Sequence, residues 1–137
     1  MSTPFLLGIL GGMGPLATLD LMHKLLRATP ASSDQQQIPH VVWNVPQIAD
    51  RQRALAGTGP SPLPQLLYGV EQLNRVGVSH IAIACNTAHH WYEALAQHSD
   101  APLLHIVDAT LAVFDGKEKP RRVGIIATQG TLDAGWF

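Results

Sequence analysis

The sequence has only one cysteine and few charged side chains, and both scarcities exclude classes of protein. A single cysteine cannot form a disulfide within the chain, and its use here is typical of a reducing compartment. Charged residues make up 14% of the 137, against roughly 25% in an average soluble domain. The net charge is −1, which excludes an electrostatic case for nucleic acid or an anionic membrane as the main partner.

The chain also lacks an uninterrupted apolar run of membrane-spanning length. The apolar stretch at residues 5–22 is broken by a Gly-Gly-Met-Gly-Pro segment, and no basic residue precedes it. We therefore expect a soluble, cytoplasmic protein. Hydrophobic residues account for 46% of the chain, which is enough for a substantial core. Scarce charge beside abundant apolar residues predicts that part of the surface is covered, either in a homo-oligomer or by a missing second half.

Short apolar runs alternate with helical patterns, which predicts an α/β fold with a parallel sheet and helices on both faces. In such sheets ligands bind beyond the carboxyl ends of the strands. Residues 45–60 are expected to form a long loop. Strands are expected at residues 5–10, 40–44, 80–84, 103–106 and 123–127. Helices are expected at residues 15–28, from 63 to a stop at Gly77, from the turn at 85–87 to about 97, and at 108–114.

A weak internal repeat bears on domain organisation. The segment Leu-Gly-Ile-Leu-Gly at residues 7–11 resembles Val-Gly-Ile-Ile-Ala at residues 123–127. The similarity predicts that a second copy of the first half begins near residue 122. We expect residues 1–115 to form one α/β domain, and residues 116–137 to be a linker and the first strand of an incomplete second domain.

Cys85 is the most informative position, because it lies where a predicted strand ends and a predicted helix begins. A helix N-terminus stabilises a thiolate, and Asn86 and Thr87 add donors that favour an anion. The alternative is a small buried side chain at a strand end, with Asn86 and Thr87 capping the helix. The position by itself leaves both interpretations open.

Other candidates lie in the loops that follow the remaining strands. Arg51 could hold a carboxylate through two parallel hydrogen bonds, or it could be part of a solvated charged loop. The glycine-rich segment at residues 11–15 could let the backbone approach a ligand, or could be a plain tight turn; it fits neither the dinucleotide nor the phosphate-loop pattern. The segment at residues 128–131, with Thr128 and Thr131, could supply hydroxyl donors after the last predicted strand.

The histidines do not predict a metal site. His89 and His90 are adjacent, so on a helix they point about 100° apart, and no His or Cys pair has zinc-ligand spacing. They could tune Cys85, although surface histidines are the commoner case. We expect no metal.

Taken together, these segments resemble the aspartate/glutamate racemase superfamily, most closely its aspartate racemase branch. The matching segments run in the family's order along nearly the whole chain, and the Gly-Gly-Met-Gly-Pro and Cys-Asn-Thr-Ala-His blocks are the most specific. The matches are residues 8–18, 29–31 with 34–35, 46–51, 85–89 and 127–131.

The resemblance implies two similar α/β domains with the active site between them, and catalysis without pyridoxal phosphate, metal or nucleotide. It implies a small amino-acid or dicarboxylate substrate, and two cysteines that act on opposite faces of its α-carbon. By that match Cys85 is one acid/base catalyst. The implied substrate-binding residues are Asn86, Thr87 and Thr128 for the carboxylate or amine, Arg51 and Gln52 for the side-chain carboxylate, and Met13 as a lining residue.

The sequence also departs from the family pattern. It has no second cysteine, and Gln129 stands where a threonine is usual. Three hypotheses follow: a truncated amino-acid racemase specific for aspartate or glutamate, a one-cysteine relative such as a decarboxylase or a dicarboxylate isomerase, and a catalytically inactive binding or assembly fragment.

Overall fold

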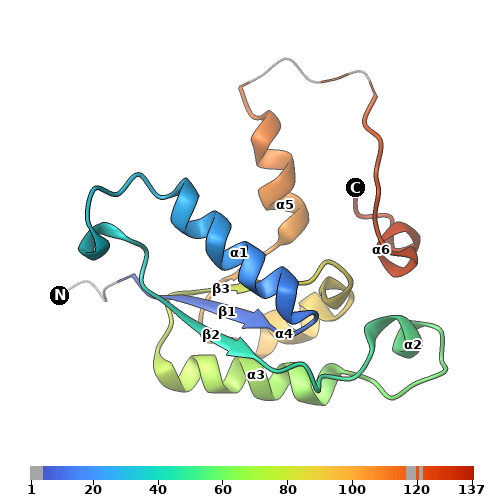
Figure 1. Ribbon diagram of the computed structural model, residues 1–137. Helices are drawn as coiled ribbons and strands as arrows, with labels where there is room; N and C mark the ends of the chain where they lie inside the picture. The colour runs from blue at the N-terminus through green and yellow to red at the C-terminus, as the bar shows by residue number, and fades with distance from the viewer. Residues whose placement is uncertain (1–4, 117–119, 121) are drawn as a thin grey trace.

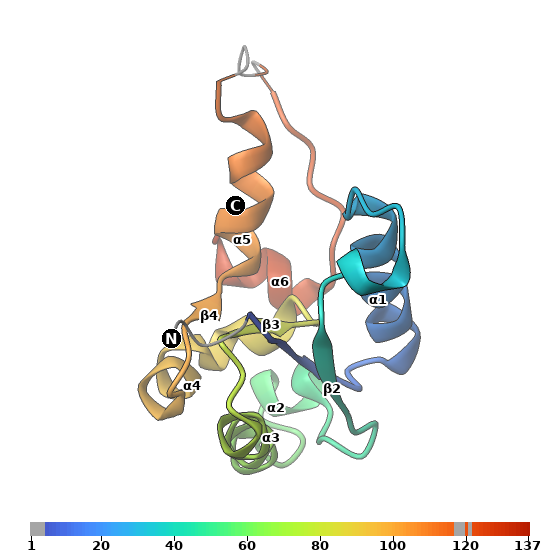
Figure 2. The same ribbon diagram turned by 90° about the vertical axis from the view of Figure 1, so that its left-hand side faces the viewer.

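The fold is built on a four-stranded parallel sheet, as the alternating sequence pattern predicts. The computed structural model describes residues 5–116, 120 and 122–137. The strands lie in the order β2-β1-β3-β4, and every neighbouring pair is parallel (Figure 1; β4 is labelled in Figure 2). Their bounds are β1 Leu7–Gly11, β2 His40–Asn44, β3 His80–Ile83 and β4 Leu103–Leu104.

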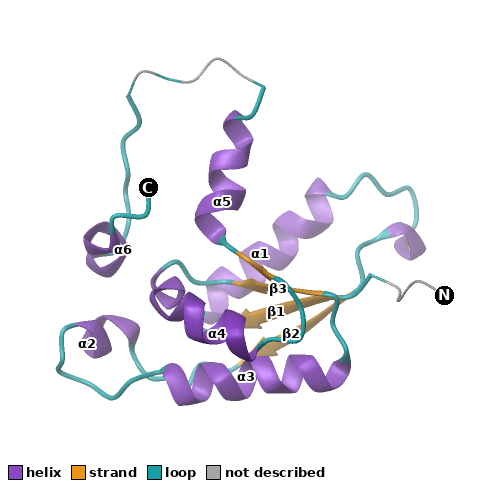
Figure 3. Ribbon diagram, turned by 180° about the vertical axis from the view of Figure 1, so that it is seen from behind, coloured by secondary structure: helices purple, strands orange, loops and turns teal. Residues whose placement is uncertain are grey.

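Helices cover both faces of this sheet, which confirms the predicted architecture. Helix α1 lies over one face, whereas α3 and α4 lie over the other (Figures 1 and 3). The α-helices are α1 Pro15–Ala28, α2 Arg51–Leu55, α3 Leu63–Val76, α4 Tyr92–His98, α5 Ile106–Leu111 and α6 Gln129–Ala134. Three short 3₁₀ helices are η1 Asp34–Gln36, η2 Thr87–Trp91 and η3 Ala112–Phe114.

The strand order creates a switch point between β1 and β3. The chain passes from β1 to one neighbour, β2, and then crosses to the other side of β1 to form β3. Loops that leave neighbouring strands toward opposite faces open a crevice at this point, where ligands bind in open α/β sheets. The backbone N–H of Ala84 donates to the carbonyl of Leu10 at 2.9 Å, which continues the pairing beyond β3. The loops after β1 and β3 are thereby held side by side.

The core lies between the sheet and α3. Leu10 and Ile81 from the strands are fully buried in this core, as are Leu66 and Val70 from the helix. Burying one such side chain contributes roughly 1.5–3 kcal/mol, so the helical spacing of these apolar residues is what fixes α3 against the sheet. The same pattern ends where predicted, because the residue after Val76 is a glycine in the left-handed conformation.

Several predicted elements differ from those observed. Residues 123–127 form no strand: they are exposed, and no described strand lies beside them to complete a ladder. The predicted loop at 45–60 contains helix α2, whose first turn is capped by Asp50 accepting from the Arg53 N–H. Strand β4 is shorter than predicted because α5 already begins at Ile106, capped by the His105 ring.

The domain division at residue 115 stays a prediction, and part of the predicted linker (117–119 and 121) lies outside the described residues. Within the described part of the chain, no helix is both long and apolar enough to cross a membrane.

Candidate active site

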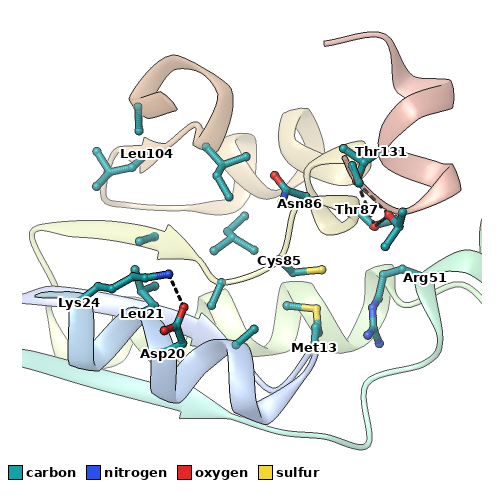
Figure 4. Close-up of a pocket in the computed structure, with 18 of the residues that line it drawn as sticks. Met13, Asp20, Leu21, Lys24, Arg51, Cys85, Asn86, Thr87, Leu104 and Thr131 are labelled. Carbon is teal, nitrogen blue, oxygen red and sulfur yellow. Dashed lines mark hydrogen bonds and ion pairs between the residues drawn. The ribbon is translucent and has the colours of Figure 1, made fainter. Parts of the chain in front are cut away.

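An open cleft of about 830 Å³ lies at the carboxyl ends of the strands. It is lined by residues from α1, the loop after β1, α2, β3, α5 and the segment around α6 (Figure 4). All the site residues proposed from the sequence line this one cleft, although they come from segments up to 115 positions apart: Met13, Arg51, Gln52, Cys85, Asn86, Thr87 and Thr128.

Cys85 directly follows Ala84, whose backbone continues the pairing of β3 with β1. Its thiol is free and partly exposed. In Figure 4 its sulfur points into the cleft, on the side of Met13 and Arg51. The side chain also packs, partly buried, against the hydrophobic core, so it borders both the core and the cleft. The capping alternative is wrong, because Asn86 makes no side-chain capping bond to η2.

The segment after Cys85 is not the regular helix that the sequence predicts. It begins as the 3₁₀ helix η2, and the α-helical conformation starts only at Tyr92. Peptide dipoles are less well aligned in a short 3₁₀ segment than in an α-helix. The helix dipole therefore stabilises a thiolate at Cys85 less than the sequence predicts.

A cluster of three threonine hydroxyls forms one wall of the cleft. Thr87 Oγ1 lies 3.0 Å from Thr128 Oγ1 and 3.5 Å from Thr131 Oγ1, and the latter two oxygens lie 3.0 Å apart. The sequence predicts hydroxyl donors in the segment 128–131, which includes Thr131, but assigns Thr131 no substrate contact. Thr128 is the N-cap residue of α6 and Thr131 lies three positions later, so both lie on one side of the helix.

Gln52 is oriented by this same wall. Its Nε2 donates to Thr87 Oγ1 at 3.3 Å, and its Oε1 accepts from the Gly130 N–H at 3.1 Å. The amide nitrogen therefore joins α2 to η2, and the amide oxygen joins α2 to α6. This arrangement assigns Gln52 a structural contact that its predicted role in substrate binding did not include.

Arg51 opens helix α2 and lines the cleft at the same end as the threonine wall (Figure 4). Its Nη1 donates to the carbonyl oxygens of Ile48 and Ala49, each at 3.0 Å. No described residue accepts a hydrogen bond from Nε or Nη2. Beside it, the backbone N–H of Arg53 holds the pKa of the Asp50 carboxyl below its usual value, so a negative charge also borders this end of the cleft.

The other end of the cleft was not predicted. It is bounded on α1 by Asp20 and Lys24, whose exposed ion pair measures 2.6 Å, and by apolar side chains near Leu104. An exposed pair at this helical spacing contributes only about 0.3–0.5 kcal/mol, so it is not a major stabilising contact.

The two adjacent histidines have different environments. His90 is exposed, as expected for a surface histidine, but His89 is buried, and its Nδ1 lies 2.8 Å from the carbonyl oxygen of Cys85. Burial is the main reason that the pKa of His89 lies below its ordinary value. Nowhere in residues 5–116, 120 and 122–137 do three or more His, Cys, Asp or Glu side chains gather in a way that could hold a metal ion.

Comparison with known proteins agrees with the resemblance seen in the sequence. A sequence profile described as Asp/Glu/hydantoin racemase matches residues 10–137. The broad-specificity amino-acid racemase RacX of Bacillus subtilis (strain 168) is 29% identical over 136 residues, which cover 94% of this chain and 57% of RacX.

Solved structures give the same picture of the fold. An aspartate racemase from Picrophilus torridus superposes with a TM-score of 0.75 at 35% identity, over 81% of this chain and 47% of that protein. An aspartate racemase homologue from Pyrococcus horikoshii OT3 superposes with a TM-score of 0.63 at 20% identity, over 79% of this chain and 47% of that one. The chain thus spans about half the length of the relatives it matches.

Proposed function

The chain belongs to the Asp/Glu/hydantoin racemase family, and we propose that it carries half of the active site of an amino-acid racemase acting on aspartate or glutamate. We further propose that Cys85 is an acid/base catalyst and that the reaction needs neither pyridoxal phosphate nor a metal nor a nucleotide. The match covers only 47% of each of the two solved relatives, so the proposal concerns the chemistry of this cleft.

The observation that carries the proposal is the convergence of one thiol, one guanidinium and a hydroxyl cluster on a single cleft. Removing the α-proton of an amino acid leaves a carbanion whose charge spreads onto the carboxylate, so fixed donors around that carboxylate lower the barrier. We propose that Asn86, Thr87 and Thr128, which line the cleft, supply such donors. The free donors of Arg51 suit a second carboxylate on the substrate side chain.

In the proposed step the Cys85 thiolate takes the α-proton, and the electron pair of the broken C–H bond passes to the substrate carboxylate. Inversion is complete when an acid on the opposite face returns a proton to the α-carbon. The 137 residues hold no second cysteine, so that acid is a group of another kind or lies outside these residues. A thiolate is an effective base only where the site keeps water away from it.

Chiral chromatography tests this function. L- and D-aspartate and L- and D-glutamate are each incubated with the protein and with Cys85→Ala, with and without EDTA. We expect the enantiomers to interconvert with the wild type, to be unaffected by EDTA, and to fall to background with the variant. Appearance of a decarboxylated amino acid without inversion would instead support the one-cysteine alternative. Saturable binding with no turnover in either protein would support an inactive binding fragment.

A further inference from the structure

Both ring nitrogens of His89 are used by the fold. Nδ1 lies 2.8 Å from the carbonyl oxygen of Cys85, and Nε2 accepts from the backbone N–H of Ile106 at 3.2 Å. Because a backbone N–H can only donate, Nε2 must be the unprotonated nitrogen, and the ring proton therefore lies on Nδ1 and is donated to Cys85. The network fixes one tautomer of a neutral ring, four residues after the thiol.

The ring is also held in place by aromatic neighbours. Tyr92 stacks nearly parallel to it, at a centroid distance of 6.1 Å, while His105 meets it edge-on at 5.0 Å. Trp136, from the segment after α6, lies edge-on at 6.5 Å. Only 3% of His89 is exposed, and the residue does not line the cleft. It contacts the thiol-bearing loop from behind.

We propose that His89 is a positioning residue that fixes the location of the Cys85 thiol. The Nδ1–H anchors the carbonyl of residue 85, and the Ile106 N–H prevents the ring from rotating away from that carbonyl. Since the backbone of residue 85 sets the position and direction of its Cα–Cβ bond, anchoring that backbone restricts the positions that the sulfur can occupy in the cleft. His89 touches no reacting atom and acts only through Cys85.

The effect of His89 on catalysis rests on the proposed function, whereas its effect on the position of the thiol can be tested without it. Cys85 is the only cysteine, so its rate of alkylation by iodoacetamide can be followed by mass spectrometry without any substrate. Failure of the racemase assay therefore leaves this test intact, and failure of this test leaves the racemase proposal open.

Two variants separate positioning from packing. In His89→Asn the side-chain amide reaches the place of Nδ1 and can still donate to the Cys85 carbonyl. In His89→Gln it reaches the place of Nε2 instead and leaves that carbonyl without its donor. Both variants lose the ring and its aromatic contacts, so they form a matched pair for stability, which denaturant unfolding measures.

We expect His89→Gln to speed alkylation about fivefold or more, because the released loop exposes a thiol that is now partly covered, and His89→Asn to stay within about twofold of the wild type. In the racemase assay the Gln variant should lose kcat with little change in KM. Equal alkylation rates in all three proteins, or equal changes in both variants, would overturn the proposal and leave His89 as a packing residue.

Ile106→Pro keeps the proposal testable if either His89 variant does not fold. Proline is tolerated at the first position of a helix, which is where Ile106 stands in α5, and it removes the N–H that fixes Nε2. The proposal predicts faster alkylation in this variant too, whereas an unchanged rate in a folded sample would contradict it.

Discussion

Arg51 uses one nitrogen of its guanidinium to hold the loop before α2, through the carbonyls of Ile48 and Ala49. Among the described residues nothing accepts from its Nε or Nη2, and the side chain lines the cleft beside Cys85. A guanidinium with one edge bound to backbone and the other edge free can receive a carboxylate in a fixed orientation.

Replacing Arg51 with alanine should therefore raise KM for aspartate by roughly 10- to 150-fold, since a hydrogen bond to a charged group contributes about 1.5–3 kcal/mol. Arg51→Lys should recover only part of this loss, because an ammonium cannot present two parallel donors. Steady-state racemisation of aspartate measures the effect, with alanine as a substrate that has no side-chain carboxylate. An equal rise in KM for both amino acids would contradict the assignment.

His89 gives the folded protein a specific pH dependence. Burial lowers its pKa most, the neighbouring His105 lowers it further, and the Cys85 carbonyl only partly offsets them. Just below the ordinary histidine pKa of about 6.5, His89 is protonated in the unfolded chain but still neutral in the folded protein. The stability contributed by His89 is complete above that pH and is lost as the pH falls toward the lower folded-state pKa.

Denaturant unfolding between pH 5 and 8 should show this loss on the acid side, with a slope of at most about 1.4 kcal/mol per pH unit for one proton. The aromatic groups that face the ring are His105, Tyr92 and Trp136. His89→Asn removes the His89 share and should flatten the profile. Parallel profiles for the two proteins would show that His89 does not titrate differently on folding.

At the scale of elements, helix α6 is attached to the body of the protein by few polar contacts. Gln52 joins it to α2 through the Gly130 N–H, and Thr128 and Thr131 join it to Thr87. Much of the remaining surface near it is exposed, including Leu132. The wall of the cleft that α6 provides therefore depends on one glutamine and one hydroxyl cluster.

Gln52→Ala should make amide exchange in residues 129–134 faster by roughly 10- to 100-fold, because the two lost hydrogen bonds together contribute about 1–3 kcal/mol. Hydrogen–deuterium exchange with mass spectrometry measures this, and α3 should be unchanged. Gln65→Ala is a matched control, since its amide bridges Ala49 and Gln47 instead. Faster exchange of α6 in the control as well would argue against a specific role for Gln52.

The turn after β1 has a glycine that no other residue can replace. Gly12 has a φ of 95°, and a Cβ there would lie 2.4 Å from the backbone carbonyl of Val45, at the end of β2. Gly77 also has positive φ, but nothing lies near it, and Gly124 has open space with no positive φ. Gly12 therefore combines positive φ with a steric clash, Gly77 has positive φ alone, and Gly124 has neither.

Alanine at these glycines should destabilise in a graded way. We expect Gly124→Ala to change the free energy of unfolding by less than about 0.5 kcal/mol, and Gly77→Ala to lower it by about 1–2 kcal/mol. Gly12→Ala should lower it by about 3 kcal/mol or more, because the backbone of Val45 cannot move aside without disturbing β2. Denaturant midpoints measure the series, and equal losses at positions 12 and 77 would contradict the close packing of this turn.

The sequence predicts well those elements whose formation is decided locally. Proline at the start of α1 and glycine after α3 mark helix ends wherever they occur, and both helices lie within a residue of their predicted bounds. The residues at 123–127 have the composition of a strand, but a strand also needs a neighbour, which no local pattern supplies. The contact of Gln52 with Gly130 spans 78 positions and depends on the whole fold.

At the scale of the whole molecule, the cleft gathers every predicted site residue because the strand order places the loops after β1 and β3 together. The parallel sheet also explains why these residues could be identified before the fold was known, since functional loops follow its strands. The sequence could not predict the contacts that each side chain makes. Gln52 bridges α2 to Thr87, and His89 is buried behind the loop that carries the thiol.

Apolar side chains remain on the surface at this scale. Leu16 and Leu19 on α1, together with Val123 and Ile126 in the segment before α6, are among the more exposed of them. The chain spans about half the length of its relatives. Association with another copy of the chain or with a missing half stays a prediction, consistent with this surface and with the low content of charge.

Exchange of the α-proton of aspartate in D₂O, followed by proton NMR, tests most directly whether Cys85 is a working base. We expect the α-proton signal of L-aspartate to disappear with the wild-type protein and to persist with Cys85→Ala. Exchange at equal rates in both proteins, or no exchange with a wild-type sample whose circular dichroism shows a folded α/β protein, would contradict the assignment of Cys85 as the base.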